Sequence, residues 1–161
     1  MLLSGVIAGL ALGIAVGRQW RRLEKLQIKW LPVLGLALVA RAVAPVAPFA
    51  FGLDLLGIAL TTGFAAANWR LPGAPLVALG SFLNLTVIVI NGAMPVDVIA
   101  LQATGGRLHE DALHIPLSDQ SLLPALADII ILPIVRTAYS FGDVLIAIGG
   151  FLLPFVTLTR R

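Results

Sequence analysis

The hydrophobic positions of this 161-residue chain form long unbroken runs instead of the short alternating patterns of soluble strands and amphipathic helices. About 20 apolar residues in helical form cross the ~30 Å hydrocarbon core of a bilayer, so each long run predicts a transmembrane helix. The predicted spans are residues 1–17, 31–45, 53–67, 75–96 and 141–159. The pattern therefore predicts an all-α fold, a polytopic transmembrane helix bundle of about five spans, with residues 1–161 as a single integral membrane domain.

Two segments before the last span interrupt this pattern. Residues 97–121 are the longest polar stretch, and we expect them to form an outer loop. Residues 122–135 are apolar but are too short for a crossing and contain Pro124 and Pro133. We expect a short re-entrant or interfacial helix in this second segment.

The composition supports a membrane location. Apolar residues make up 59% of the chain and charged residues 12%, against roughly 45–50% and ~25% in soluble domains. The chain has no cysteine, which excludes disulfides, thiolate metal sites and a cysteine nucleophile. Carboxylates, amides, hydroxyls and two histidines remain for chemistry, and we expect no cofactor.

The positive charges predict the orientation of the bundle. The formal net charge of +3 would suggest nucleic acid in a soluble protein, but basic residues of membrane proteins collect on the cytoplasmic side. A basic stretch follows the first span, which places the N-terminus outside and the C-terminus inside. In this orientation eight of the 11 basic residues lie on the inner side: Arg18, Arg21, Arg22, Lys25, Lys29, Arg70, Arg160 and Arg161.

Glycines recur every four residues in the first span, at Gly5, Gly9, Gly13 and Gly17. This spacing forms a smooth ridge along one side of a helix, where another backbone can approach closely. We expect the ridge to contact the protein's own helices, and a homodimer or partner subunit is the alternative.

Polar residues inside the spans need partners, because an unpaired charge at that depth costs about 2.5–3.5 kcal/mol or more. The hairpin between the second and third spans brings Arg41 and Asp54 to a similar depth, which predicts a buried pair. Asn84 and Asn91 lie two turns apart on one face of the fourth span. They either bond to neighbouring helices or form a polar lining at the outer mouth of the bundle.

Asp128 and Asp143 are the strongest candidates for chemistry. Paired carboxylates in a site of low dielectric can share a proton and act as acid and base around one water. A turn near Pro133 would let the two acids meet, with Arg136 between them as a counterion. The alternative is that each aspartate caps a helix or pairs with Arg136.

The polar loop contains His109, Glu110, Asp111 and His114. The two histidines are five residues apart, whereas HExxH zinc sites place them four apart on one helix face. We therefore expect a solvated loop and no metal site. Nothing in the chain is typical of a surface that binds nucleic acid.

Four segments carry a resemblance to a known family: residues 68–73 (NWRLPG), 84–96 (NLTVIVINGAMPV), 126–130 (LADII) and 140–149 (SFGDVLIAIG). In this order they resemble an uncharacterised bacterial membrane family, domain of unknown function 5317 (DUF5317). The resemblance implies a multi-pass protein of the bacterial plasma (inner) membrane and supplies no activity.

A weaker resemblance involves Asn91, Asp128 and the Phe141-Gly142-Asp143 sequence before an apolar helix. Their order is similar to the motifs of lipoprotein signal peptidase, an intramembrane aspartyl enzyme. The flanking Gly-Asn and Arg of that enzyme are absent around Asp128. The resemblance therefore implies catalytic roles for Asp128 and Asp143 only.

Three functions are compatible with these features. The first is a non-catalytic accessory or scaffold subunit, whose partners would be other membrane subunits or a second copy of the chain. The second is an intramembrane aspartyl hydrolase that uses Asp128 and Asp143 at the outer face. The third is a small transporter or lipid-binding protein with a polar path through the bundle. In each case the lipid bilayer surrounds the chain.

Overall fold

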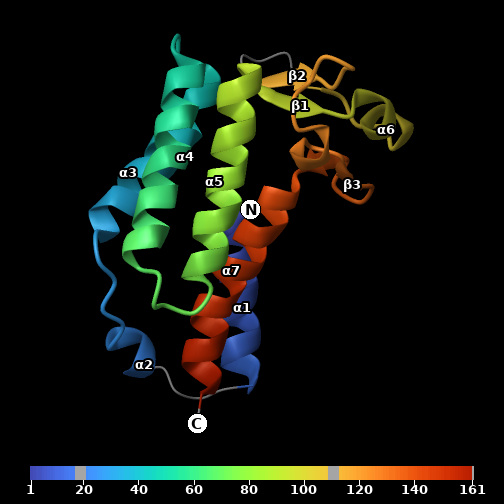
Figure 1. Ribbon diagram of the computed structural model, residues 1–161. Coiled ribbons are helices and arrows are strands. Elements are labelled where there is room, and N and C mark those ends of the chain that lie inside the picture. Colours follow the sequence, from blue (N-terminus) through green and yellow to red (C-terminus); the bar gives the residue numbers. More distant parts are fainter. Residues whose placement is uncertain (17–20, 109–112, 161) are drawn as a thin grey trace.

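The structure, a computed structural model, describes residues 1–16, 21–108 and 113–160 and is mostly helical (Figure 1). The α-helices are α1 (Leu2–Val16), α2 (Arg21–Glu24), α3 (Leu31–Val43), α4 (Ala50–Ala67), α5 (Ala74–Asn91), α6 (Val98–Ala103) and α7 (Phe141–Thr159). Two short 3₁₀ helices are η1 (Ala44–Val46) and η2 (Pro124–Leu126). The strands are β1 (Met94–Val96), β2 (His114–Pro116), β3 (Ile130–Leu132) and β4 (Thr137–Tyr139).

Three of these helices, α4, α5 and α7, are long and apolar enough to cross a membrane. The apolar helices α1 and α3–η1 are shorter. At most 39% of the residues in each long apolar segment are buried, so most of the apolar surface faces outward, as lipid contact requires. The prediction of a mostly helical chain with helices of membrane-spanning length is confirmed.

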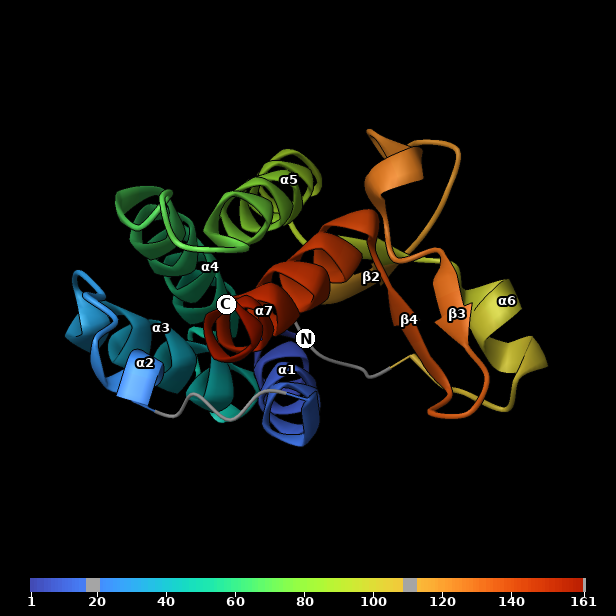
Figure 2. The ribbon, with the colours of Figure 1, turned by 90° about the horizontal axis from the view of Figure 1, so that it is seen from below.

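The helices pack in the order α3, α4, α5, α7, α1. Figure 2 shows α7 in the middle, with α1 and α5 on two of its sides. α1 runs parallel to α7, whereas α5 runs antiparallel to it. A helix therefore lies in each of the five runs predicted as spans, and the first and last of these helices are direct neighbours.

The glycine ridge of α1 lies against α7. Gly5, Gly9 and Gly13 are buried, and a Cβ atom added at Gly5 or Gly9 would overlap the carbonyl oxygen of Ala147 or Phe151. The ridge thus contacts the chain's own last helix over its described part, while Gly17 lies outside the described residues.

Glycines also set the position of α7 along α5. Gly149 lies against Gly73, and Gly142 lies against Gly80 and Asn84. The first turn of α7 is therefore beside the middle of α5, and α7 extends well below the turn that joins α4 to α5 (Figure 1). This offset leaves space above α7, beside the upper half of α5.

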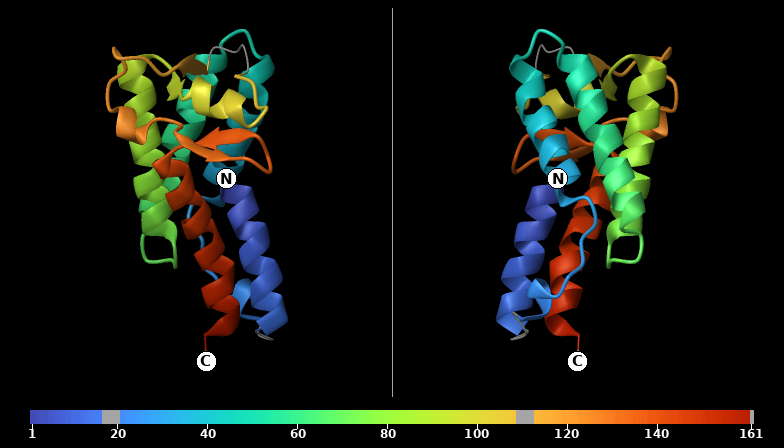
Figure 3. Two further views of the ribbon diagram at one scale, coloured as in Figure 1. Left: turned by 90° about the vertical axis from the view of Figure 1, so that its right-hand side faces the viewer. Right: turned by 90° about the vertical axis from the view of Figure 1, so that its left-hand side faces the viewer.

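Residues 92–108 and 113–139, here called the cap, fill that space (Figure 3). β1 and β2 pair in parallel, with Met94 opposite His114, and β3 and β4 form an antiparallel hairpin. Met94 and Leu126 pack with Ile58, Val87 and Ile88 in a hydrophobic cluster that joins the cap to α4 and α5.

The cap changes three of the predicted segments. The fourth span ends at Asn91 and not at residue 96, because Gly92 adopts a positive φ of 77° that ends the helix. Where we predicted a short re-entrant or interfacial helix in residues 122–135, the segment holds the three-residue 3₁₀ helix η2 and then strand β3. Pro124 and Pro133 disfavour a longer helix, and the β-branched Ile129–Ile131 run favours a strand. The predicted polar loop contains α6 and β2.

Substitution of the ridge glycines tests this packing. We expect Gly9→Ala to destabilise the fold by about 1–3 kcal/mol, because the new methyl group overlaps the Phe151 carbonyl. Gly35→Ala is the matched control, since no atom lies within 4 Å of a Cβ at Gly35. Thermal unfolding in detergent measures both, and equal losses at the two positions would contradict the α1–α7 contact.

Candidate functional site

A polar cavity of about 220 Å³ lies between the upper helices, the cap and the first turn of α7. Its apolar wall includes Ile58, Ile88 and Met94. Its polar lining comes from α3, α4, α5, β2, the cap and α7: Arg41, Asp54, Asn84, His114, Asp128 and Asp143. The cavity therefore brings together both aspartates singled out from the sequence and the predicted Arg41–Asp54 pair.

Asp143 is positioned by the capping box that starts α7. The Ser140 hydroxyl accepts a hydrogen bond from the Asp143 backbone N–H (3.0 Å), and the Ser140 backbone N–H donates to Asp143 Oδ2 (3.2 Å). Ser140 is fully buried. A carboxylate in this position is also stabilised by the positive end of the helix dipole.

Asn84 holds Asp143 from the opposite helix. Its amide nitrogen Nδ2 donates to Asp143 Oδ1 (3.2 Å), while its Oδ1 accepts from the Ser140 hydroxyl (2.9 Å). Both oxygens of Asp143 therefore accept from an N–H group. Asn84 can reach these atoms because Gly142 has no side chain that would occupy the space of its amide.

Asp128 is positioned by the backbone of β1. Its N–H donates to the Pro95 carbonyl (2.9 Å), and its own carbonyl accepts from the Asp97 N–H (3.0 Å). The residue is 7% exposed, and within the described part of the chain its Oδ1 is enclosed without a hydrogen-bond partner. Burial, and secondly repulsion from the Asp143 carboxylate, raise the pKa of Asp128 to about 8.

Arg41 and Asp54 form an ion pair at the edge of the cavity, with Arg41 Nε 3.3 Å from Asp54 Oδ1. Asp54 is buried, whereas the arginine side chain is 42% exposed. The arginine supplies the charge that a buried aspartate needs.

Two of the predicted lining residues lie elsewhere. Asn91 exchanges hydrogen bonds with the backbone of Leu122, with its Oδ1 accepting at 2.8 Å and its Nδ2 donating at 3.0 Å. It therefore attaches the cap to the end of α5. Arg136 forms no ion pair with Asp128 or Asp143, and it lines a separate cavity in the cap.

Among the described residues, no group of three histidine or acidic side chains is arranged to hold a metal ion. His114 lines the polar cavity and interacts with another group of the protein. The other members of the sequence cluster, His109, Glu110 and Asp111, lie outside the described residues.

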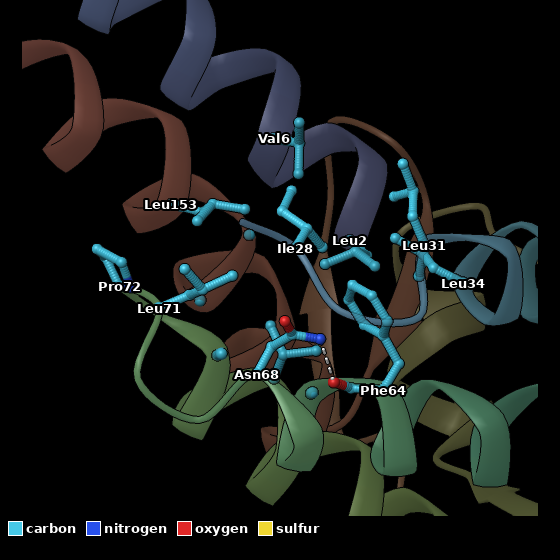
Figure 4. Close-up of a pocket in the computed structure, with 15 residues that line it drawn as sticks. Leu2, Val6, Ile28, Leu31, Leu34, Phe64, Asn68, Leu71, Pro72 and Leu153 are labelled. Atoms are coloured by element: carbon cyan, nitrogen blue, oxygen red, sulfur yellow. Dashed lines mark hydrogen bonds between the residues drawn. The ribbon is translucent and has the colours of Figure 1, made fainter. Parts of the chain in front are cut away.

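A further cavity, of about 90 Å³, is almost wholly apolar (Figure 4). Leu2 and Val6 of α1, Phe64 of α4 and Leu153 of α7 meet there. Its polar member, Asn68, donates from Nδ2 to the carbonyls of Phe64 and Lys29, and its Oδ1 accepts from the Lys29 N–H. These bonds fix the segment before α3, and the cavity offers no groups for acid–base chemistry.

Sequence reasoning missed Ser140 as a site residue. The signal was present, because Ser140 stands three residues before Asp143, which is the spacing of a capping box at the start of an apolar run. It predicted that Asn84 bonds to a neighbouring helix or forms a polar lining, but not that its partner is Asp143, because this contact depends on the offset between α5 and α7.

The cavity thus holds two carboxyl groups in unlike environments. Asp143 accepts hydrogen bonds from two N–H groups, whereas Asp128 is buried and retains its proton at neutral pH. One acid and one carboxylate facing the same small cavity can act as proton donor and proton acceptor for a molecule between them.

Comparison with known proteins identifies a family. No curated protein and no solved structure matches the chain. The sequence model of a family of unknown function (DUF5317) matches residues 25–155, which is most of the chain and includes the whole polar cavity. The resemblance found in the sequence is confirmed, and the chain belongs to the DUF5317 family.

Proposed function

We propose that this protein is an intramembrane aspartyl hydrolase that uses Asp128 and Asp143. The observation that carries the proposal is the shared cavity, in which a protonated Asp128 and a hydrogen-bonded Asp143 face the same space. In such a pair Asp128 can donate a proton and Asp143 can accept one.

The chemistry requires one water and one scissile amide or ester bond. Asp143 accepts a proton from the water as its oxygen attacks the carbonyl carbon. Asp128 donates its proton to the leaving nitrogen or oxygen. The pair holds one proton before and after the reaction, and proton exchange with solvent returns it from Asp143 to Asp128.

The substrate class follows from the surroundings of the cavity. The helices around it are apolar on their outer faces and of membrane-spanning length. A lipid-anchored or membrane-embedded substrate can reach such a site sideways, from the bilayer. Arg41, which is partly exposed at the edge of the cavity, can contact a polar group of that substrate.

The proposal includes five spans in the bacterial plasma membrane, with the N-terminus outside and the C-terminus inside. It is supported by the grouping of basic segments at one end of the molecule. Arg22 donates a hydrogen bond to the carbonyl of Arg160, and Lys29 is bonded to Asn68 beside Arg70. The cap lies at the opposite end (Figure 1).

The two other functions have less support. The accessory-subunit hypothesis drew on the glycine ridge, and α7 occupies that ridge. The transporter hypothesis needed Asn91 in a polar path, and Asn91 is bonded to the cap backbone. Neither hypothesis accounts for the unlike environments of Asp128 and Asp143.

The protonation of Asp128 provides the first test. Infrared spectroscopy should detect its protonated carboxyl, identified by the loss of the band in Asp128→Asn, with a titration midpoint near pH 8. Asp143→Asn should lower this midpoint, because the repulsion is removed. Between pH 3.8 and about 8 the folded protein holds a proton that the unfolded chain releases, so this group's contribution to stability falls as the pH rises.

Exposed Asp119 gives the control for that titration, and Asp119→Asn should leave the midpoint unchanged. A midpoint near 3.8 would contradict the burial of the Asp128 carboxyl. An unchanged midpoint in Asp143→Asn would show that the two acids do not interact.

Hydrolysis is tested with the purified full chain in vesicles made from total bacterial membrane extract. Mass spectrometry of the released peptides and fatty acids should show products that depend on the protein. Asp128→Asn and Asp143→Asn should each lower the rate about 10²–10⁴-fold, the usual contribution of a general acid or base. Asp119→Asn should keep it. Product release that is the same in the wild type and in both variants would overturn the proposal.

The absence of native cysteines makes the orientation easy to test. The variant Lys25→Cys should react with a membrane-impermeant maleimide only after cells are permeabilised. The variant Ser118→Cys, with its cysteine in the cap, should react in intact cells. The reverse result would contradict the proposed orientation without bearing on the chemistry of the aspartates.

A further inference from the structure

The cap contains a second polar cavity, of about 470 Å³, between the turn that follows α6, strand β2 and the β3–β4 hairpin. Arg107 and Arg136 line it, together with Thr137. Asp128 and His114 line both this cavity and the one between the two aspartates. The cap cavity therefore adjoins the proposed active site and is lined by two cations.

The chain adopts an unfavourable conformation to place Arg136 there. Arg136 has a positive φ of 52° in the turn of the β3–β4 hairpin, a region that non-glycine residues rarely occupy. Its side chain lies against Gly105, where a Cβ atom would be 3.8 Å from the guanidinium carbon. Arg107 follows two residues later, so Arg136 is held against the turn that carries the second arginine. Strained residues of this kind concentrate at binding sites.

The two arginines have no internal counter-charge in the part of the chain that the structure describes. The ion pair found there joins Arg41 to Asp54, and neither Arg107 nor Arg136 has a carboxylate within ion-pair distance. Asp128 faces the same cavity but forms no ion pair with either arginine, and burial raises its pKa. Two like charges beside one cavity are stabilised by a bound anion.

The surface next to these arginines is apolar. Ile134, at the tip of the hairpin two residues before Arg136, is 98% exposed, and Ile99 on α6 is 85% exposed. Val135 and Leu132 are also exposed. Exposed apolar side chains beside cations are typical of protein segments at the boundary between lipid headgroups and acyl chains.

We propose that the cap cavity binds the phosphate of an anionic phospholipid headgroup. Arg107 and Arg136 contact the phosphate oxygens, for which the planar guanidinium is suited because it can donate two parallel hydrogen bonds. Ile134 and Ile99 contact the acyl region of the same leaflet. This binding requires no proton transfer by Asp128 or Asp143 and therefore stands apart from the proposed hydrolysis.

The test uses the full chain, delipidated in a neutral detergent. Native mass spectrometry should detect bound phosphatidylglycerol but little diacylglycerol, which has the same chains without the phosphate. Arg107→Gln and Arg136→Gln should each weaken phosphatidylglycerol binding by about tenfold or more, since each removes charge-assisted hydrogen bonds. Arg21→Gln is the matched control, because Arg21 is an exposed residue of α2, which lies at the end of the molecule opposite the cap (Figure 1).

Inorganic phosphate separates the two sources of the anion. We expect it to compete with phosphatidylglycerol only at much higher concentration, because it lacks the acyl chains that Ile134 and Ile99 contact. Equal affinity for inorganic phosphate and phosphatidylglycerol would overturn the lipid assignment. Equal binding by the wild type and the double variant of Arg107 and Arg136 would overturn the site itself. Asp143→Asn should bind the lipid as the wild type does, because Asp143 lines the cavity between the two aspartates and not the cap cavity. Failure of hydrolysis and failure of this site are therefore distinguishable.

Discussion

Glycines allow the backbone of α7 to approach two other helices at once, and this packing determines the position of everything above it. Gly142 and Gly149 lie against α5, and Gly150 lies against the first turn of α1. In lipid, helices associate through such close packing and not through hydrophobic expulsion, so side chains at these positions would change the register. The register in turn places the first turn of α7, with Asp143, beside Asn84 and beneath the cap.

The cap provides the second aspartate and closes the cavity. Its short strands give it little stability of their own, since each is three residues long. It depends on the hydrophobic cluster with α4 and α5, and on the bonds from Asn91 to Leu122. Asp128 is then fixed by backbone hydrogen bonds to Pro95 and Asp97, so its carboxyl has a defined place in the lining of the cavity. The acid and the carboxylate thus come from two separately built parts of the fold.

Hydropathy was sufficient to predict the five long apolar helices, and it matched α7 (Phe141–Thr159) at both ends, because Ser140 and the terminal arginines limit the apolar run. The pairing of Arg41 with Asp54 also followed from the sequence, since a tight hairpin joins their helices, although the arginine side chain is 42% exposed and not buried. The cap did not, because strands of three residues carry no clear alternation. Nor could the sequence predict that Asp128 and Asp143 share a cavity, which depends on the offset between α5 and α7 and on the pairing of β1 with residue 128.

Three aspartates line one small cavity, and each is accommodated in a different way. Asp54 is neutralised by Arg41, and Asp143 accepts hydrogen bonds from Asn84 and from the backbone at a helix N-terminus. Within the described part of the chain Asp128 has neither kind of partner, and its burial raises the pKa so that the carboxyl keeps its proton. Ion pairing occupies Asp54, whereas the proton on Asp128 and the acceptor oxygens of Asp143 remain available to a bound molecule. A buried carboxyl group must be ion-paired, hydrogen-bonded or protonated. Because the three aspartates meet this requirement in different ways, Asp54 has a structural role, whereas Asp128 and Asp143 are suited to acid–base chemistry.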